Sequence, residues 1–237
     1  MSSGYVFTTR EQLDTAVDLW INNESLANTI YGDINEWDVS AITDFSNLFE
    51  DRRTFNSDIS SWDVSAGSNF GYMFKNTDAF NQDIGNWNVS SGSNFYEMFA
   101  SDYYLSLSDT SLFNQDIGNW DVSSGTNFSR MFSGARAFNQ DIGSWDVSNG
   151  NDFSRMFNYA EAFNQDIGSW DVSNGNDFSW IFYKAEVFNQ DIGSWDVSSG
   201  TNFSNMFNYA EAFNQDIGGW DVSNGTVYYG MFSKAES

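Results

Sequence analysis

The sequence predicts an α/β solenoid in which eight 25-residue strand–turn–helix units stack behind an N-terminal helical cap. Three observations predict it. The tetrapeptide Trp-Asp-Val-Ser, once with Asn in place of Asp, recurs eight times in the 237 residues, spaced by 25 except for one spacing of 33. Of the 23 Phe, 22 fall in three columns of the repeat, so that like residues stack on like. Each unit also joins a segment of strand period to one of helical period.

Residues 1–29 differ from the repeat and predict the helical cap. Thr8 and Glu11 have the spacing of a capping box. Four apolar residues then follow at helical spacing: Leu13, Ala16, Val17 and Trp20. We expect one helix over 9–21 and a shorter one over 24–30, because the exposed end of a repeat stack needs an amphipathic cover.

The first half of each unit predicts a short strand. Ile142, Trp145 and Val147 show its pattern, in which Trp and Val alternate onto one face. The same skeleton fits a leucine-rich repeat, so one leucine-rich-repeat-like parallel sheet is expected. The eight units fill 30–237 with an eight-residue insert within 100–112, and the whole chain is expected to form one structural domain.

The second half of each unit predicts a short helix. Phe153, Met156, Phe157 and Ala160 form one apolar helical stripe. A good N-cap residue stands two positions before the first Phe of every unit. These residues are Thr43, Ser68, Ser93, Thr126, Asn151, Asn176, Thr201 and Thr226. Gly precedes the cap in seven units, which suits a sharp turn between strand and helix.

Composition excludes several functions. The chain has 9 Lys and Arg against 33 Asp and Glu, a net charge of −24, and neither Cys, His nor Pro. Such a charge argues against nucleic acid as a partner. Without His or Cys, a Ser-His-Asp triad, a cysteine nucleophile and imidazole or thiolate metal sites are absent. Near-identical units cannot push two carboxyl pKa values apart, so we expect no enzyme and no cofactor.

Two columns of Asp are candidate sites. The first follows each Trp and is expected to line the open face of the sheet as a ligand surface: Asp38, Asp63, Asp121, Asp146, Asp171, Asp196 and Asp221. The second offers the metal candidates Asp116, Asp141, Asp166 and Asp191. Calcium is possible there but not favoured, since the spacing of an EF-hand is missing. For both columns the alternative is that the side chains satisfy turn amides.

Exposed aromatic residues form a further candidate contact surface. The insert carries Tyr103 and Tyr104, and loops often carry recognition. Tyr159, Trp180, Tyr183 and Tyr209 occupy positions outside the apolar stripe of the expected helices. Clustered exposed rings indicate a contact surface. Tolerated insertion and partial burial against neighbouring units are the alternatives.

Three segments carry a resemblance to a known family. They are the repeat FNQDIGSWDVS, the later F-x-x-M-F, and the leader TTREQLDTAVDLW…YGDINEWDVSAITDFSNLF. They resemble the bacterial surface protein 26-residue repeat family, of BspA type and leucine-rich-repeat-like. The resemblance implies a non-enzymatic repeat domain that mediates adhesion on cell surfaces or particles, and it implies no catalytic residue.

Together these observations predict a non-catalytic structural or adhesion-type repeat protein, exposed on a surface or part of a virion, that acts through protein–protein contacts. The alternative is a monomeric recognition module that binds a glycan, a cation or a basic protein on its Asp/Ser-rich sheet face. Expected partners are proteins, or a second copy through the C-terminal end, with a glycan possible. No stretch could insert in a membrane, and the start lacks a signal peptide. Synthesis in the cytoplasm and an extracellular or particle location are therefore expected.

Overall fold

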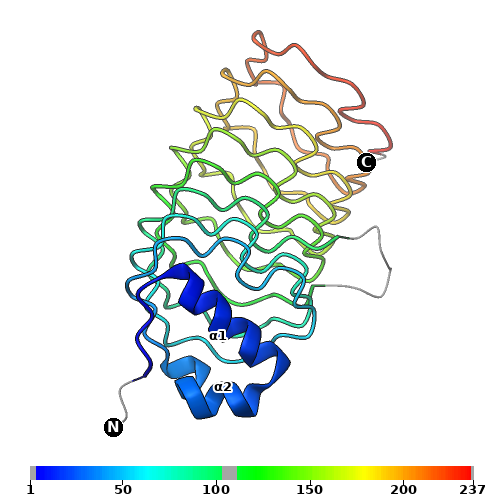
Figure 1. Ribbon diagram of the computed structural model, residues 1–237. Coiled ribbons are helices and arrows are strands. Elements are labelled where there is room, and N and C mark those ends of the chain that lie inside the picture. The colour runs from blue at the N-terminus through cyan, green and yellow to red at the C-terminus, as the bar shows by residue number, and fades with distance from the viewer. Residues whose placement is uncertain (1–3, 103–110, 236–237) are drawn as a thin grey trace.

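The computed structural model describes residues 4–102 and 111–235. Regular helices occur near the N-terminus, where α1 (Arg10–Asn22), α2 (Glu24–Tyr31) and the 3-10 helix η1 (Ile34–Glu36) follow one another. Beyond them the chain runs as a stack of coils, each lying on the one before it (Figure 1).

The two helices expected in the leader are confirmed to within one residue at each end. The face of α1 that packs on the first coils buries the predicted residues, Leu13, Ala16, Val17 and Trp20. Its capping box joins Thr9 and Gln12, one residue later than the predicted pair. The division of the chain at residues 29 and 30 stays a prediction.

The predicted solenoid of strand–turn–helix units is wrong. Within the described ranges no extended strand is formed, and no α-helix follows α2. Neighbouring coils are joined by isolated parallel bridges, one residue per coil, and not by a sheet. One bridge joins Val6 to Asp38, and the other bridges link a single column: Asp44, Asn69, Asn94, Asn127, Asp152, Asp177, Asn202 and Val227.

The segment expected to be a strand consists of turns. The N–H of Trp145 donates to the carbonyl of Ile142 at 3.1 Å, and the N–H of Gly150 to that of Val147 at 2.8 Å. Both bonds close tight turns of four residues. Trp145 and Val147 nevertheless point inward, with 3% and 1% of their surface exposed, so the pattern identified the buried side chains and not the backbone.

The segment expected to be a helix alternates between two kinds of hydrogen bond. The N–H groups of Met156 and Asn158 donate within their own coil, three residues back, whereas those of Arg155, Phe157 and Tyr159 donate to carbonyls of the next coil. An α-helix would send every N–H four residues back along its own chain. Three of these five donors therefore join coils together.

The spacing of the coils explains why no helix forms. Equivalent Phe rings of neighbouring coils lie close to parallel, with centroids 5.8 Å apart for Phe132 and Phe157 and again for Phe157 and Phe182. Packed helices need about 8–10 Å between their axes. Rings stacked this closely on every coil leave no room for a layer of helices, and turns fill the space.

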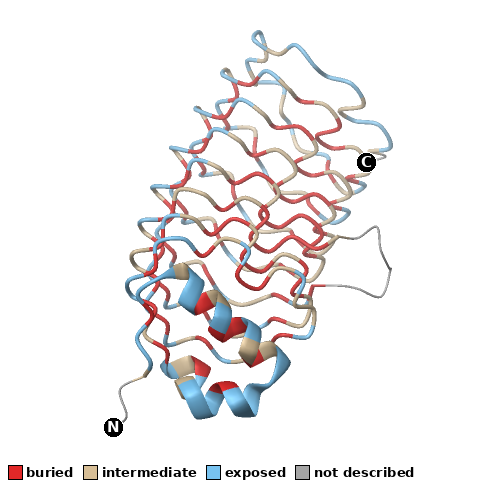
Figure 2. Cartoon of the chain, viewed as in Figure 1, coloured by how far each residue is buried: buried red, intermediate tan, exposed pale blue. Residues whose placement is uncertain are grey.

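Buried positions recur on one coil after another along the stack (Figure 2), and the aromatic residues among them stack in ladders. Trp145, Trp170 and Trp195 stack with centroids 6.4–6.5 Å apart and planes within 2°. Each indole N–H also bonds the preceding coil, as Trp170 does with the carbonyl of Ile142 at 3.0 Å. Like residues thus pack on like, as the repeat predicts.

The glycine before each expected cap has another role than the one predicted. A Cβ built on Gly150 would lie 2.5 Å from Cζ of Phe153, the ring three residues later. The ring folds back over the glycine, and only hydrogen fits beneath it. Close packing of the ring, and not a strand-to-helix turn, requires glycine here.

Candidate functional site

The Asp that follows each Trp holds a turn. Its Oδ1 accepts the backbone N–H of the Ser two residues later, at 3.0 Å for both Asp146 and Asp171. The same bond forms in the other units, at Asp38, Asp63, Asn88, Asp121, Asp196 and Asp221. These side chains were expected on the face of a sheet, and the described part of the chain forms no sheet. They are the acceptors of Asx turns.

These turns lower the carboxyl pKa in five units. The affected residues are Asp38, Asp121, Asp146, Asp196 and Asp221. In the first four the Ser hydroxyl is the larger cause, and at Asp221 the Ser backbone N–H is. Both donors stabilise the ionised carboxylate, which keeps the turn closed at neutral pH.

The second Asp column forms Asx turns too. Oδ1 of Asp116, Asp141, Asp166 and Asp191 accepts the N–H of the Gly two residues later at 2.9–3.0 Å. Across the described ranges, no group of three or more His, Cys, Asp or Glu side chains could hold a metal ion. The candidate metal column is thus engaged in backbone turns.

Residue types vary most at three positions of the unit, represented in the fifth unit by Arg155, Asn158 and Tyr159. We call these three columns the variable edge. The first column is Asn47, Tyr72, Glu97, Arg130, Arg155, Trp180, Asn205 and Gly230. The second is Glu50, Lys75, Ala100, Ser133, Asn158, Tyr183, Asn208 and Ser233. The third is Asp51, Asn76, Ser101, Gly134, Tyr159, Lys184, Tyr209 and Lys234.

Positions that are more exposed vary far less. The columns of Ser144 and Asn149 are exposed in most units and hold only Ser, Asn, Ala, Gly and a single Glu. Each column of the variable edge holds aromatic, cationic and anionic residues, whereas outside the insert the column of Glu161 exchanges only Arg for Asp or Glu. The chemical diversity of the repeat is therefore concentrated on one part of its surface.

The backbone of the variable edge is unfavourable for the residues it carries. Arg155, Tyr159 and Trp180 have φ of 58°, 57° and 60°. This left-handed conformation costs a residue with a side chain about 1–2 kcal/mol. Gly134 and Gly230 occupy equivalent positions in other units. Bulky side chains where glycine would fit better point to a role for the side chains themselves.

The structure brings four of the predicted aromatic residues together. Ring centroids of Trp180 and Tyr183 lie 4.7 Å apart, those of Tyr159 and Tyr183 5.3 Å, and those of Tyr183 and Tyr209 5.9 Å. All four are half-buried. They lie on consecutive turns, not on the expected helices. Tyr103 and Tyr104 lie outside the described residues.

Cations among these rings were missed by the sequence reasoning. Lys184 Nζ lies between the rings of Tyr159 and Tyr209, 4.9 and 5.2 Å from their centroids. The Arg155 guanidinium lies 5.5 Å from the centroid of Trp180. Cation–π contacts of this kind stabilise charge without a carboxylate. The signal was available, because five of the nine Lys and Arg fall in the variable columns.

A buried ion cluster stands beside the rings. Glu97 is 4% exposed, and its carboxylate accepts Lys75 Nζ at 2.6 Å and Arg130 Nη1 at 2.7 Å. Burial alone would raise the pKa of Glu97. Hydrogen bonds from Lys75, Arg130 and Tyr96 outweigh it and leave that pKa lowered. Burial and the bond to Glu97 raise the pKa of Tyr96.

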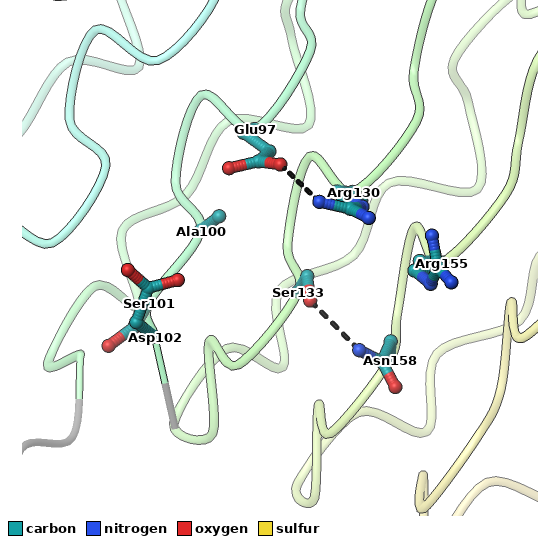
Figure 3. Close-up of a pocket in the computed structure, with 8 residues that line it drawn as sticks. All are labelled: Glu97, Ala100, Ser101, Asp102, Arg130, Ser133, Arg155 and Asn158. Atoms are coloured by element: carbon teal, nitrogen blue, oxygen red, sulfur yellow. Dashed lines mark hydrogen bonds and ion pairs between the residues drawn. The ribbon is translucent and has the colours of Figure 1, made fainter. Parts of the chain in front are cut away.

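A cavity of about 120 Å³ opens next to this cluster. Figure 3 shows Arg130 and Arg155 on neighbouring coils, with Ser101 and Asp102 across from them. Ser133 and Asn158 also line it. Every lining residue belongs to the variable edge except Asp102, which directly follows it.

The last described unit exposes apolar groups that other units bury. Tyr229 and Phe232 are 81% and 50% exposed, whereas Phe207, equivalent to Phe232, is fully buried. The expected contact at the C-terminal end concerns these residues.

The family model described as "Mycoplasma protein of unknown function, DUF285" matches residues 20–108, 105–186 and 167–237. Together these ranges cover most of the chain. The chain belongs to DUF285. This is a BspA-like repeat family, which supports the coarser part of the predicted resemblance. No curated protein and no solved structure matches the chain.

Tandem matches to DUF285 support a repeat protein. The described part of this DUF285 chain has no helix with the length and apolar character that a membrane crossing requires. Its most distinctive surface is the variable edge.

Proposed function

We propose that the chain is a non-catalytic, adhesion-type repeat protein that acts through protein–protein contacts made by the variable edge, on a cell or particle surface. One observation carries the proposal: two of the three columns that vary most between units hold bulky side chains on left-handed backbone. The surface location follows from the BspA-like character of the repeat and is part of the proposal.

Rings and cations at this edge suit a protein partner. Tyr, Trp and Arg are enriched at protein interfaces, whereas Asp and Glu are depleted there. The described units carry these residues side by side along consecutive coils, from Tyr159 to Tyr209. The alternative, a ligand face of stacked Asp on a sheet, has lost its support because residues 4–102 and 111–235 form no sheet and each Asp Oδ1 accepts a turn N–H.

Photo-crosslinking tests the proposal in the intact chain. Benzoylphenylalanine replaces Trp180, or as matched control the exposed Ser169, and the chain is irradiated in the cells that produce it. We expect discrete protein adducts from position 180, and we expect excess unlabelled chain to compete them away. Position 169 should give none. Equal adducts from both positions, or none from position 180, would contradict the proposal.

A second contact is proposed at the C-terminal end, favoured by the exposure of Tyr229 and Phe232. Light scattering after size exclusion tests it. We expect an oligomer that Phe232→Ser dissociates and Val187→Ser, an equally exposed control, leaves intact. A monomer at all concentrations would rule out self-association there.

A further inference from the structure

Arg155 is the one guanidinium of the variable edge that makes no ion pair with any described residue. Its only described side-chain partner is the ring of Trp180. Arg130, one coil away, is already paired with Glu97. A guanidinium has five N–H donors in a rigid fork that matches a carboxylate. Arg155 lines the cavity, and in a chain with 33 carboxylates its guanidinium forms no ion pair with any that the structure describes.

Trp180 prepares this fork for binding. The guanidinium lies over the indole, so its position is set before a ligand arrives. A side chain ordered in advance loses less entropy on binding. Both residues stand on left-handed backbone, at φ of 58° and 60°. Binding of a ligand by the stacked pair would account for side chains being kept at positions where this backbone conformation costs free energy.

The floor of the cavity has an amide with one end unpaired. Asn158 is 4% exposed, and its Nδ2 donates to Ser133 Oγ at 3.1 Å. Its Oδ1 has no partner. Oδ1 is buried and points away from Arg155 (Figure 3), so the amide offers no second donor beside the guanidinium. Arg155 is therefore the group left to bind an anion here.

The other charges of the cavity favour a single negative charge over two. Glu97 and Asp102 both line it. A divalent oxyanion such as sulfate would stand near both carboxylates, whereas one carboxylate can be satisfied by Arg155 with less repulsion. The cavity volume of about 120 Å³ has room for a group of this size.

We infer that this cavity receives the carboxylate of an Asp or Glu side chain of a protein partner, paired with Arg155. This inference rests on the proposed function, because it names the group that the variable edge recognises. Binding needs no covalent step and no further component.

The test follows the Nε–Hε resonances of the six Arg by NMR while propionate, an analogue of the Glu side chain, is added to the intact chain at constant ionic strength. We expect the Arg155 signal to move to saturation. The Arg52 signal, from a residue paired with Asp18, should move no more than it does with chloride. The indole Nε1–Hε1 resonance of Trp180, which lies against Arg155, should move in step with it. In R155K, where the Arg155 signal is gone, we expect this indole resonance no longer to saturate with propionate. R52K is the matched control and should bind propionate unchanged.

Several results would overturn the inference. An Arg155 signal that does not move, or that moves no more than those of the other Arg, would show that no carboxylate binds specifically beside Arg155. If sulfate bound more tightly than propionate, the inferred ligand would be wrong, and the cavity would be a site for a divalent oxyanion. Propionate binding without crosslinks at position 180 would contradict the proposed function alone, and crosslinks without propionate binding would contradict this inference alone.

Discussion

The Asx turns and the variable edge belong to the same 25-residue unit, but the Asx position is exposed in most units and hardly varies, whereas the variable edge is half-buried or buried in most units and varies most. The Asp after Trp is retained in seven units and replaced by Asn in one, because its Oδ1 must accept a turn N–H. The variable edge holds six residue types in its first column alone. Exposure by itself therefore does not free a position to change.

The difference lies in which atoms hold the fold. At the variable edge the backbone does so: the N–H groups of Arg155, Trp180 and Asn205 each bond the next coil at 2.8–2.9 Å, whatever the side chain. In the Asx turns the side chain is itself the acceptor. A repeat can vary its contact chemistry only where the backbone alone carries the stacking.

The largest effect is expected in the core. The prediction tests whether the buried rings, and not the Asx turns or the variable edge, supply most of the stability of the stack. Phe157 is fully buried and stacks on Phe132, Phe182 and, at 4.0 Å, on Phe163. We expect Phe157→Ala to lower the free energy of unfolding by about 3–5 kcal/mol, through lost burial and a cavity. Urea denaturation measures it. Val187→Ala, at a 45% exposed site, should change the free energy of unfolding little. A similar loss from both variants would show that the buried rings contribute no more to stability than the surface does.

A second prediction concerns Glu97, the one member of the first variable column that is a buried anion. Glu97→Gln leaves Lys75 and Arg130 without their carboxylate, and we expect a loss of about 2–3 kcal/mol. Because the pKa of Glu97 is lowered on folding, its contribution is full above the ordinary value of about 4.5 and falls as pH drops through the folded pKa.

Unfolding of both chains between pH 3 and pH 7 checks this sign. The difference between wild type and Glu97→Gln should be largest at pH 7 and shrink in acid. Glu211→Gln, at an exposed position, should cost little at any pH. A difference that grew in acid would show that Glu97 is not held ionised by its partners.

The sequence allowed the packing to be predicted better than the backbone. Trp145 and Val147 point inward as their alternation indicated, and α1 lies where its stripe and cap placed it. Phe153, Met156 and Phe157 satisfied a helical stripe, but consecutive tight turns bury the same residues. Only the distance between coils decides between the two, and a one-dimensional pattern does not contain it.

In the candidate site, too, the sequence predicted some features and not others. The rings from Tyr159 to Tyr209 could be found because they stand outside the core columns. The pairing of Lys75 with Glu97 spans 22 residues and the stacking of Arg155 on Trp180 spans 25. Both follow from the stacking of coils, which brings unlike residues of one edge together. The variable columns themselves are visible in the sequence when the units are compared position by position.

A third prediction separates the hydrogen bond of an Asx turn from its charge. Asp146→Ala removes the acceptor of the Ser148 N–H, and we expect a loss of about 1 kcal/mol, as for a helix N-cap. Asp146→Asn keeps an acceptor, as Asn88 does with Ser90 at 3.1 Å, and should cost less. Thermal unfolding ranks the two variants. An equal cost would mean that charge, and not the turn bond, retains Asp here.

The smallest expected change in stability is at Trp180, where the comparison is sharpest. Asn stands in the same column at Asn47 and Asn205, with φ of 61° and 53°, so Trp180→Asn places a residue that tolerates this backbone. Lost contacts with Arg155 and Tyr183 oppose the relieved strain, and we expect the free energy of unfolding, measured by urea denaturation, to change by no more than about 0.5 kcal/mol.

The same variant should lose the propionate-dependent shift of Arg155, since the guanidinium no longer has a ring to lie on. A variant that kept its stability but lost this signal would show that the side chain serves contact and the backbone serves the fold. A loss above about 2 kcal/mol, of the size of a buried side chain, would instead place Trp180 with the core.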